Sequence, residues 1–222
     1  FYLDQRENRA LLQKIVKPGM RVLDLFTYSG GFALNAARAG AEVLGVDLKE
    51  DAVELARANA SRNGITNVDF VTDNCFEWLD DQAREGEHWD LIIVDPPAIA
   101  HSKEKWERLR WAMWRLVRRS LEQQGVGDRV FAFTCSHHLN RTRFLETLRF
   151  AGADSGRHLQ VMREVTQPTD HPWSLQIPES QYLRGFLVET VETVEIREEA
   201  KFARTKRAAD VIQDLSIDEL ID

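Results

Sequence analysis

Two segments of the chain have a similar pattern. They are Leu91-Ile92-Ile93-Val94-Asp95-Pro96-Pro97 and Val130-Phe131-Ala132-Phe133-Thr134-Cys135-Ser136. Each is a short apolar run that ends at a chemically reactive or polar group. Such runs are typical of strands buried on both faces of a parallel sheet. Because ligands bind beyond the carboxyl ends of the strands in these sheets, we expect the Asp95 carboxylate and the Cys135 thiol to lie side by side in a site.

Strand-like and helix-like segments alternate from residue 21 onward, which predicts βαβ units and a parallel sheet. Two later strand-like segments, 158–165 and 183–194, are separated by a proline-containing loop with no helix pattern, so they should pair antiparallel at an edge. We therefore expect an α/β fold with a doubly wound, Rossmann-like sheet of seven strands, five parallel plus a terminal antiparallel pair. The first five strands are expected near 22–25, 42–46, 68–71, 91–94 and 130–133, and helices near 33–39, 50–62, 75–83, 103–122 and 141–150.

Composition narrows the class of protein. The chain has 222 residues, of which 43% are hydrophobic and 29% charged, as in an ordinary globular protein. No apolar run approaches the ~20 residues that cross a bilayer, and two cysteines do not make a disulfide framework. We expect a cytoplasmic protein with reduced thiols and no membrane contact.

The net charge of -7 argues against a surface that holds nucleic acid by charge alone. One stretch, residues 103–119, is locally basic and contains Trp106, Trp111 and Trp114. The interpretation we favour for it is an amphipathic helix with a solvated basic face and tryptophans in the core. Any contact with nucleic acid should therefore be local.

Three carboxylates follow the first three expected strands. Asp24 precedes the turn Ser29-Gly30-Gly31, whose spacing differs from the G-x-G-x-x-G that faces a pyrophosphate. A carboxylate at this point suits an ammonium group better than a phosphate. Asp47 is placed to accept hydrogen bonds from ribose hydroxyls, and Asp73 from an adenine amino group. S-adenosylmethionine has an ammonium, a ribose and an adenine and no phosphate, so it fits this pattern.

These motifs, in this order, resemble class I S-adenosylmethionine-dependent methyltransferases. Within that class they are similar to the RNA cytosine-5 methyltransferases that act on large-subunit ribosomal RNA and carry an N-terminal PUA domain. The resemblance covers about residues 1–194. It rests on the opening 1–9, the loop 24–32, Asp47, Asp73, Asp95-Pro96-Pro97, Thr134-Cys135-Ser136, Asp170-His171-Pro172 and Tyr182-Leu183-Arg184-Gly185.

The resemblance implies three segments: a cofactor-covering segment (1–20), the methyltransferase domain (21–195) and a charged helical extension (196–222). It also implies S-adenosylmethionine as cofactor, a ribosomal RNA substrate and no metal. Cys135 and Asp95 would be catalytic, and Pro96 and Pro97 would contact the substrate. The residues expected to bind the cofactor are Gln5, Arg6, Asp24, Phe26, Tyr28, Gly30, Asp47, Asp73 and Asp95.

The sequence departs from the family pattern in three respects. No PUA domain precedes Phe1, so we expect RNA capture to be aided by an upstream domain that this sequence does not contain. Ile99 stands where relatives carry an aromatic residue, which weakens the case for base stacking there. The charged tail has no counterpart that we recognise.

The chemistry can be argued from the residues. Carbon 5 of cytosine attacks a methyl sulfonium only after a nucleophile has added to carbon 6. Cys135 is the candidate nucleophile, provided that its pKa is lowered or a base lies nearby, and Asp95 can hydrogen-bond the ring nitrogen. Ala98 occupies the place where two-cysteine enzymes carry a second thiol, so the base that removes the carbon-5 proton is not identified.

Two other functions remain open. The Asp-Pro-Pro turn can also hold an exocyclic amine, so methylation of such an amine or of another nucleic-acid group is one alternative. A non-catalytic RNA-binding module with the same fold is another.

Overall fold

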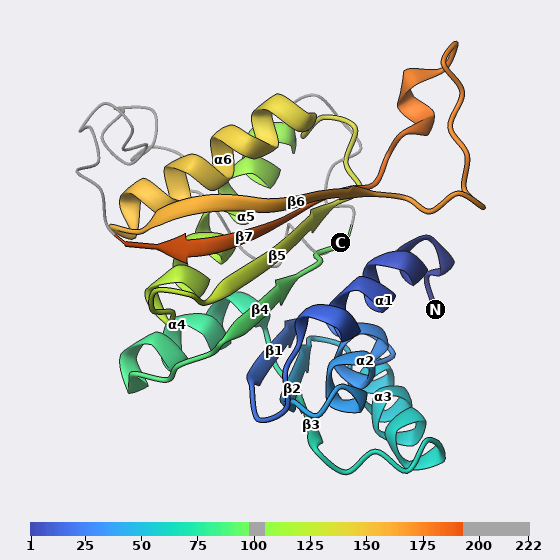
Figure 1. The fold of residues 1–222 in the computed structure, drawn as a ribbon, viewed down its shortest axis with the longest axis vertical. Helices are drawn as coiled ribbons and strands as arrows, with labels where there is room; N and C mark the ends of the chain where they lie inside the picture. Colours follow the sequence, from blue (N-terminus) through green and yellow to red (C-terminus); the bar gives the residue numbers. More distant parts are fainter. Residues whose placement is uncertain (98–104, 193–222) are drawn as a thin grey trace.

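A mixed sheet forms the centre of the computed structural model, which describes residues 1–97 and 105–192 (Figure 1). Its seven strands within those residues run in the order β3-β2-β1-β4-β5-β7-β6. β1 to β5 are parallel, whereas β7 is antiparallel to both β5 and β6. This confirms the predicted sheet. The strands are β1 (Arg21–Leu25), β2 (Glu42–Asp47), β3 (Val68–Thr72), β4 (Leu91–Val94), β5 (Arg129–Thr134), β6 (His158–Thr166) and β7 (Arg184–Val191).

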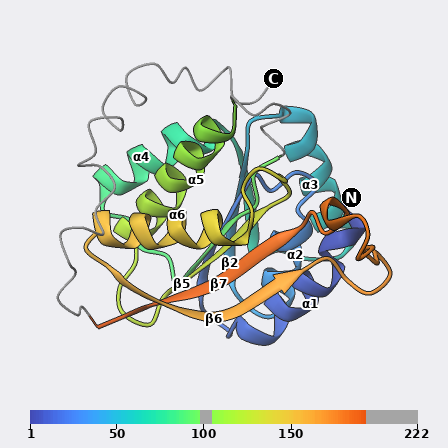
Figure 2. The same ribbon diagram turned by 90° about the horizontal axis from the view of Figure 1, so that it is seen from above.

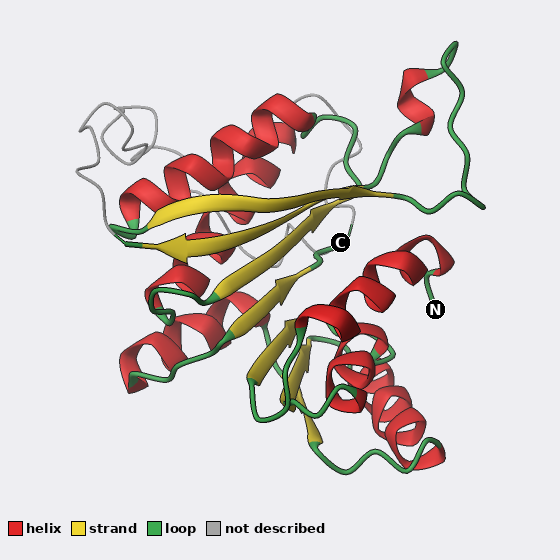
Figure 3. Ribbon diagram, in the orientation of Figure 1, coloured by secondary structure: helices red, strands yellow, loops and turns green. Residues whose placement is uncertain are grey.

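Helices cover both faces of the sheet (Figures 2 and 3). One face is covered by α1, α2 and α3, the other by α4, α5 and α6, and each face has its own buried apolar cluster. The two central strands β4 and β5 are buried almost throughout, which explains their continuous apolar sequences. The helices are α1 (Arg6–Ile15), α2 (Gly31–Arg38), α3 (Glu50–Arg62), α4 (Cys75–Glu85), α5 (Lys105–Glu122) and α6 (Arg141–Asp154), with 3₁₀ turns at Leu3–Gln5 and Pro178–Ser180.

The basic stretch forms α5, and its described part confirms the amphipathic interpretation. Trp111 and Trp114 are 5% and 4% exposed. Arg115 and Arg119 both reach the Asp80 carboxylate, at 2.6 Å each. These charges are therefore engaged within the protein. No helix among the described residues is long and apolar enough to span a membrane.

The N-terminal segment holds a helix that the sequence analysis did not assign. α1 packs against α2, with Leu12 fully buried and Val16 only 6% exposed in the shared core. The expected extension 196–222, together with Ala98, Ile99 and the first residues of the basic stretch, lies outside the described residues.

The loop between β6 and β7 projects past the end of the sheet, on the side of α1 (Figure 1). Two contacts tie it to that helix: Arg6 forms an ion pair with Asp170 at 2.8 Å, and Asn8 donates to the carbonyl of Thr166 at 3.5 Å. Segments from the two ends of the described chain therefore meet at the edge of the sheet where the first five strands end.

Candidate active site

The carboxyl ends of β1 to β5 share one edge of the sheet because these strands are parallel. Asp24 lies near the end of β1, Asp47 ends β2, and Asp73 follows β3 by one residue. Asp95 and Cys135 directly follow β4 and β5. The five side chains that the sequence singled out are thus brought to one edge.

The loop from β1 to α2 has an unusual backbone. Phe26 and Tyr28 have positive φ angles of 60° and 49°, and Gly30 has one of 80°. Non-glycine residues in this region are strained, and such strain persists only where the surroundings enforce it. Here Asp47 Oδ2 accepts from the Tyr28 N–H at 2.8 Å, and Cys75 Sγ accepts from the Phe26 N–H at 3.4 Å.

Cys75 is buried at the start of α4. Burial raises the pKa of its thiol. Because its Sγ accepts from the Phe26 N–H, Cys75 holds the loop against the start of α4.

The two aromatic residues of the loop face different ways. Phe26 packs edge-on against Phe76 in the apolar cluster under α4 and α5, with ring centroids 6.1 Å apart. Tyr28 is 41% exposed, and its ring contacts that of Tyr2 at 5.5 Å between centroids. Of the two, only Tyr28 presents its ring at the protein surface near the N-terminal segment.

Asp24 is enclosed by the loop, with only 1% of its surface exposed. Its Oδ2 accepts from the Thr27 hydroxyl at 2.7 Å and from the Ala33 N–H at 2.9 Å. Burial raises the pKa of Asp24 to about 7, although both hydrogen bonds act to lower it. The carboxylate thus fixes the loop against the first turn of α2.

Asp47 and Asp73 lie on adjacent strand ends, joined by a hydrogen bond from the Asp73 N–H to the Asp47 carbonyl at 2.9 Å. Besides Tyr28, Asp47 accepts from the Lys49 N–H at 3.0 Å. Asp73 is exposed and accepts from the Asn74 N–H at 2.7 Å. Both keep lone pairs for further donors, since a carboxylate has about four acceptor positions.

Asp95 is partly buried and is contacted by the N-terminal segment. Gln5, only 4% exposed, donates from Nε2 to Asp95 Oδ2 at 3.1 Å. Burial, aided by the negative charge of Asp24, raises the pKa of Asp95 to about 7, although the Gln5 hydrogen bond acts to lower it. After it, Pro96 is buried and Pro97 exposed. Gln5, which the sequence predicted to bind the cofactor, thus contacts Asp95.

Cys135 stands beyond the end of β4. Val94 pairs with Ala132, so Phe133 and Thr134 continue past the last residue of β4 before the thiol is reached. Burial raises the pKa of Cys135 to about 11, and the charge of Asp95 adds to the effect. The structure thus gives the thiol a raised pKa rather than the lowered one expected of a ready nucleophile.

Arg9 is a site residue that the sequence analysis missed. It is 5% exposed, and its Nη1 donates to the Tyr2 carbonyl at 2.8 Å. Its Nη2 is buried and has no hydrogen-bond partner within the described ranges. Burial lowers the pKa of Arg9, whereas the charges of Asp4 and Asp95 raise it. An arginine in a polar helical segment is usually solvated, so nothing in the local sequence indicates that this one is buried, with its guanidinium 4.1 Å from the centroid of the Phe1 ring.

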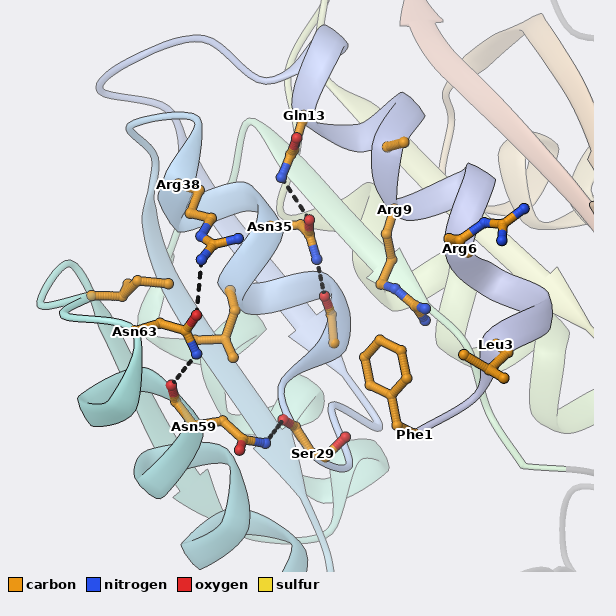
Figure 4. Close-up of a pocket in the computed structure, with 14 residues that line it drawn as sticks. Phe1, Leu3, Arg6, Arg9, Gln13, Ser29, Asn35, Arg38, Asn59 and Asn63 are labelled. Carbon is orange, nitrogen blue, oxygen red and sulfur yellow. Dashed lines mark hydrogen bonds between the residues drawn. The ribbon is translucent and has the colours of Figure 1, made fainter.

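A cavity of about 530 Å³ adjoins this region, between α1, α2 and α3 (Figure 4). Arg6 and Arg9 of α1 line it, with Ser29 and Gly31 from the glycine loop. Figure 4 shows Gln13 donating to an amide on α2 across the cavity. Arg6, expected to bind the cofactor, lies at this cavity and pairs with Asp170.

The charged groups of the site favour a ligand that carries charges of both signs. Carboxylates lie at the ends of four strands. The buried guanidinium of Arg9, whose Nη2 has no hydrogen-bond partner among the described residues, lies close enough to Asp95 for the two charges to interact. A zwitterionic ligand satisfies both signs of charge, because buried charges need partners. An amino-acid moiety joined to a nucleoside meets this requirement.

Comparison with known proteins agrees with this chemistry. A family model described as a methyltransferase domain matches residues 16–127, half of the chain. "Ribosomal RNA large subunit methyltransferase I" of Aeromonas salmonicida is 35% identical over 191 residues, which are 85% of this chain and 48% of the relative. The protein of the same name from Tolumonas auensis is 34% identical over 86% of this chain and 49% of its own length. The chain thus spans about half the length of these relatives.

The fold of this chain is also similar to that of a solved structure. The crystal structure of SMU.776, described as a methyltransferase complexed with SAH, matches with a TM-score of 0.73 and 26% identity. The match covers 85% of this chain and 50% of that chain. SAH is S-adenosylhomocysteine, the product that S-adenosylmethionine becomes after it has lost its methyl group.

Proposed function

This chain belongs to the S-adenosylmethionine-dependent methyltransferases, and we propose that it methylates carbon 5 of a cytosine in ribosomal RNA through Cys135. The observation that carries the proposal is the placement of the Cys135 thiol and the Asp95 carboxyl after neighbouring parallel strands. The RNA class follows from the names of the two relatives, both of them ribosomal RNA large subunit methyltransferases. We further propose that another domain aids RNA capture, because the chain has a net charge of -7.

The described residues fit the cofactor, which supplies a methyl group on a sulfonium. In our proposal Arg9 binds the carboxylate of its methionine part, since Nη2 is buried and has no hydrogen-bond partner among the residues described, while the guanidinium lies over the Phe1 ring. Asp47 and Asp73 accept from the ribose and adenine, because each has unused acceptor positions. Gly30 and Gly31 let the backbone approach closely, and a Cβ at Gly31 would already touch Arg9 at 3.5 Å.

Asp95 acts on the base. Cytosine N3 is a hydrogen-bond acceptor, so an ionised carboxylate, which only accepts, would repel it. Since the pKa of Asp95 is raised to about 7, a large share of the group is protonated at neutral pH and can donate to N3. A hydrogen bond to N3 draws electrons from carbon 6 and prepares it for addition.

Cys135 then adds to carbon 6: the sulfur–carbon 6 bond forms, the π electrons of the carbon 5–carbon 6 bond shift toward carbon 5 and the ring protonated at N3, and the thiol proton passes to the Asp95 carboxylate that the donation to N3 has left. The negative charge of Asp95 is one cause of the raised pKa of the thiol. Protonation of Asp95 removes that charge, so the pKa of the thiol falls when the base is bound in the way proposed. The two raised pKa values thus become parts of one mechanism, in which Asp95 donates and Cys135 attacks.

The decisive experiment uses RNA in which 5-fluorocytosine replaces cytosine, because fluorine at carbon 5 blocks the release of the thiol. Wild type should form a protein–RNA band that survives denaturation, and Cys135→Ser should form none. Cys75→Ser is the matched control, since Cys75 is the other free thiol and lies beneath the loop. Methylation that persists in Cys135→Ser would exclude the covalent route.

One observation favours a second candidate, methylation of an exocyclic amine. The raised pKa of Cys135 is what a thiol without a nucleophilic role would show. In that case Asp95 and the Pro96 carbonyl would hold the amine, and nuclease digestion followed by mass spectrometry would find the methyl group on nitrogen. The same digest would find 5-methylcytidine if the first proposal holds.

A further inference from the structure

The phenol of Tyr182 and the carboxylate of Asp4 meet across 178 residues of sequence. Tyr182 donates from its hydroxyl to Asp4 Oδ2 at 2.9 Å. The other oxygen, Asp4 Oδ1, is buried and accepts no hydrogen bond from any described residue. A buried acceptor without a donor is costly, so this oxygen calls for a functional explanation.

The pair lies beside Cys135. β5 and β7 are antiparallel with Thr134 opposite Arg184, so the residue after Thr134 and the two residues before Arg184 leave the sheet together. The charges of Asp4 and Cys135 influence one another, as do those of Cys135 and Tyr182. Gln5, the neighbour of Asp4, contacts Asp95.

Tyr182 is held firmly in this position. Its N–H donates to Gln167 Oε1 at 3.1 Å, and its carbonyl accepts from Arg184 Nη1 at 3.2 Å. Burial, together with the hydrogen bond to Asp4, raises the pKa of the phenol to about 12, so Tyr182 stays a donor at neutral pH. Asp4 Oδ2 is therefore occupied while Oδ1 remains available.

The cytosine reaction requires a proton acceptor at this place. The methyl group arrives at carbon 5 from the face of the ring opposite the thiol, which leaves the carbon-5 hydrogen on the same face as Cys135. An acceptor takes this proton, the electrons of the C–H bond form the carbon 5–carbon 6 double bond, and the carbon 6–sulfur bond breaks to release the thiolate. The acceptor must therefore stand next to Cys135.

We propose that Asp4 is this base, that Oδ1 receives the carbon-5 proton, and that Tyr182 positions the carboxylate through Oδ2; the inference rests on the proposed function. In this proposal the N-terminal segment takes part in catalysis through Asp4, in addition to contacting Asp95 through Gln5. It also supplies the base that the sequence left unidentified, since Ala98 replaces the second cysteine.

The test compares Asp4→Asn with wild type on an unmodified large-subunit ribosomal RNA transcript and on the same transcript made with 5-fluorocytosine. Asparagine keeps an oxygen for the Tyr182 hydroxyl but cannot take the proton. Asp4→Asn should trap a denaturation-resistant adduct on the ordinary transcript, with the trapped base already methylated, and its turnover should fall about 10²- to 10⁴-fold. Wild type should leave an adduct on the fluorinated transcript alone.

Two further variants test the roles of Asp4 and Tyr182 separately, and a third serves as the control. Asp4→Glu restores a carboxylate and should release the adduct again. Tyr182→Phe keeps the base but loses its positioning, so turnover should fall less than in Asp4→Asn. Glu7→Gln removes an exposed negative charge from the same segment and should behave as wild type.

Each contrary result has a distinct meaning. Wild-type turnover by Asp4→Asn would overturn the inference while leaving the Cys135 mechanism intact. Loss of adduct on both transcripts in Asp4→Asn would assign Asp4 to RNA or cofactor binding and would also overturn it. A wild type that forms no adduct on fluorinated RNA would refute the cytosine proposal, and the role of Asp4 would fall with it.

Discussion

Gln5 Nε2 and Asp95 Oδ2 are 3.1 Å apart, although the two residues are separated by 90 positions in the sequence. This hydrogen bond favours the ionised form of Asp95 and opposes the effect of burial on its pKa. The N-terminal segment thus adjusts the protonation of the group that we propose contacts the base.

Replacing Gln5 with Leu should therefore raise the pKa of Asp95 further. A hydrogen bond to a charged group is worth about 1.5–3 kcal/mol, so we expect an upward shift of about one to two pKa units. Carbon-detected NMR titration of the carboxyl groups measures it. Gln13→Leu, on the outer side of α1, removes a hydrogen bond to Asn35 and should leave Asp95 unchanged. An unaltered Asp95 titration in Gln5→Leu would show that the contact does not form in solution.

The raised pKa of Asp95 also predicts how stability depends on pH. The folded protein holds this proton up to about pH 7, whereas the unfolded chain loses it near the ordinary aspartate pKa of 3.8. The folded state therefore binds more protons between these values, and this contribution to stability is present below about pH 4 and lost as the pH rises through 7.

Asp95→Asn abolishes that loss, so between pH 4 and pH 8 the free energy of unfolding of the variant should rise relative to that of wild type by up to about 4 kcal/mol. Urea denaturation at several pH values checks the result. Asp81→Asn, which removes an exposed carboxylate from α4, is the control. A constant difference between Asp95→Asn and wild type at all pH values would contradict the expectation.

Asp47 should matter to the cofactor in two ways. It accepts from the Tyr28 N–H, which holds the strained loop, and we propose that it accepts from the ribose. Loss of two charge-assisted hydrogen bonds should cost about 2–3 kcal/mol, so Asp47→Ala should bind S-adenosylmethionine about 30- to 150-fold more weakly. Titration calorimetry measures the affinity. Asp51→Ala on the exposed start of α3 should bind as wild type, and equal affinity in Asp47→Ala would remove that residue from the site.

Gly45 is required by the packing beneath the glycine loop. A Cβ there would lie 2.6 Å from the Phe70 ring and 2.9 Å from Thr27 Oγ1. Gly45→Ala should therefore destabilise the fold by about 1–3 kcal/mol in denaturant titration. Adding Phe70→Leu should recover part of the loss by clearing the ring contact. At Gly31 a Cβ meets ordinary contacts, so Gly31→Ala is the comparison, and a similar stability of both glycine variants would contradict the argument.

Much of the fold could be predicted from the sequence because its strongest signals are local. The helix over Glu50–Arg62 agrees with the predicted range, since a charged first turn and spaced alanines mark it clearly. The apolar runs at 91–94 and 130–133 identified the two central strands. α1 was missed because two of the residues that it buries, Asn8 and Arg9, are polar, so that its buried face has no clear apolar pattern.

The site was predicted less completely, for a physical reason. A carboxylate at the end of a strand can be inferred from the strand itself, which is how Asp47 and Asp95 were found. The contact between Tyr182 and Asp4 joins residues 178 positions apart in the chain, and no local pattern predicts it. The same holds for Arg6, whose partner Asp170 comes from the β6–β7 loop.

Residues 4–8 contact partners that lie between 90 and 178 positions later in the chain. During translation these residues leave the ribosome before every one of those partners. Contacts of such long sequence separation form late, because loop closure must precede them. The sheet can therefore assemble while Asp95 and Cys135 are still uncovered, and the catalytic centre becomes complete only after Tyr182 has been synthesised and docked.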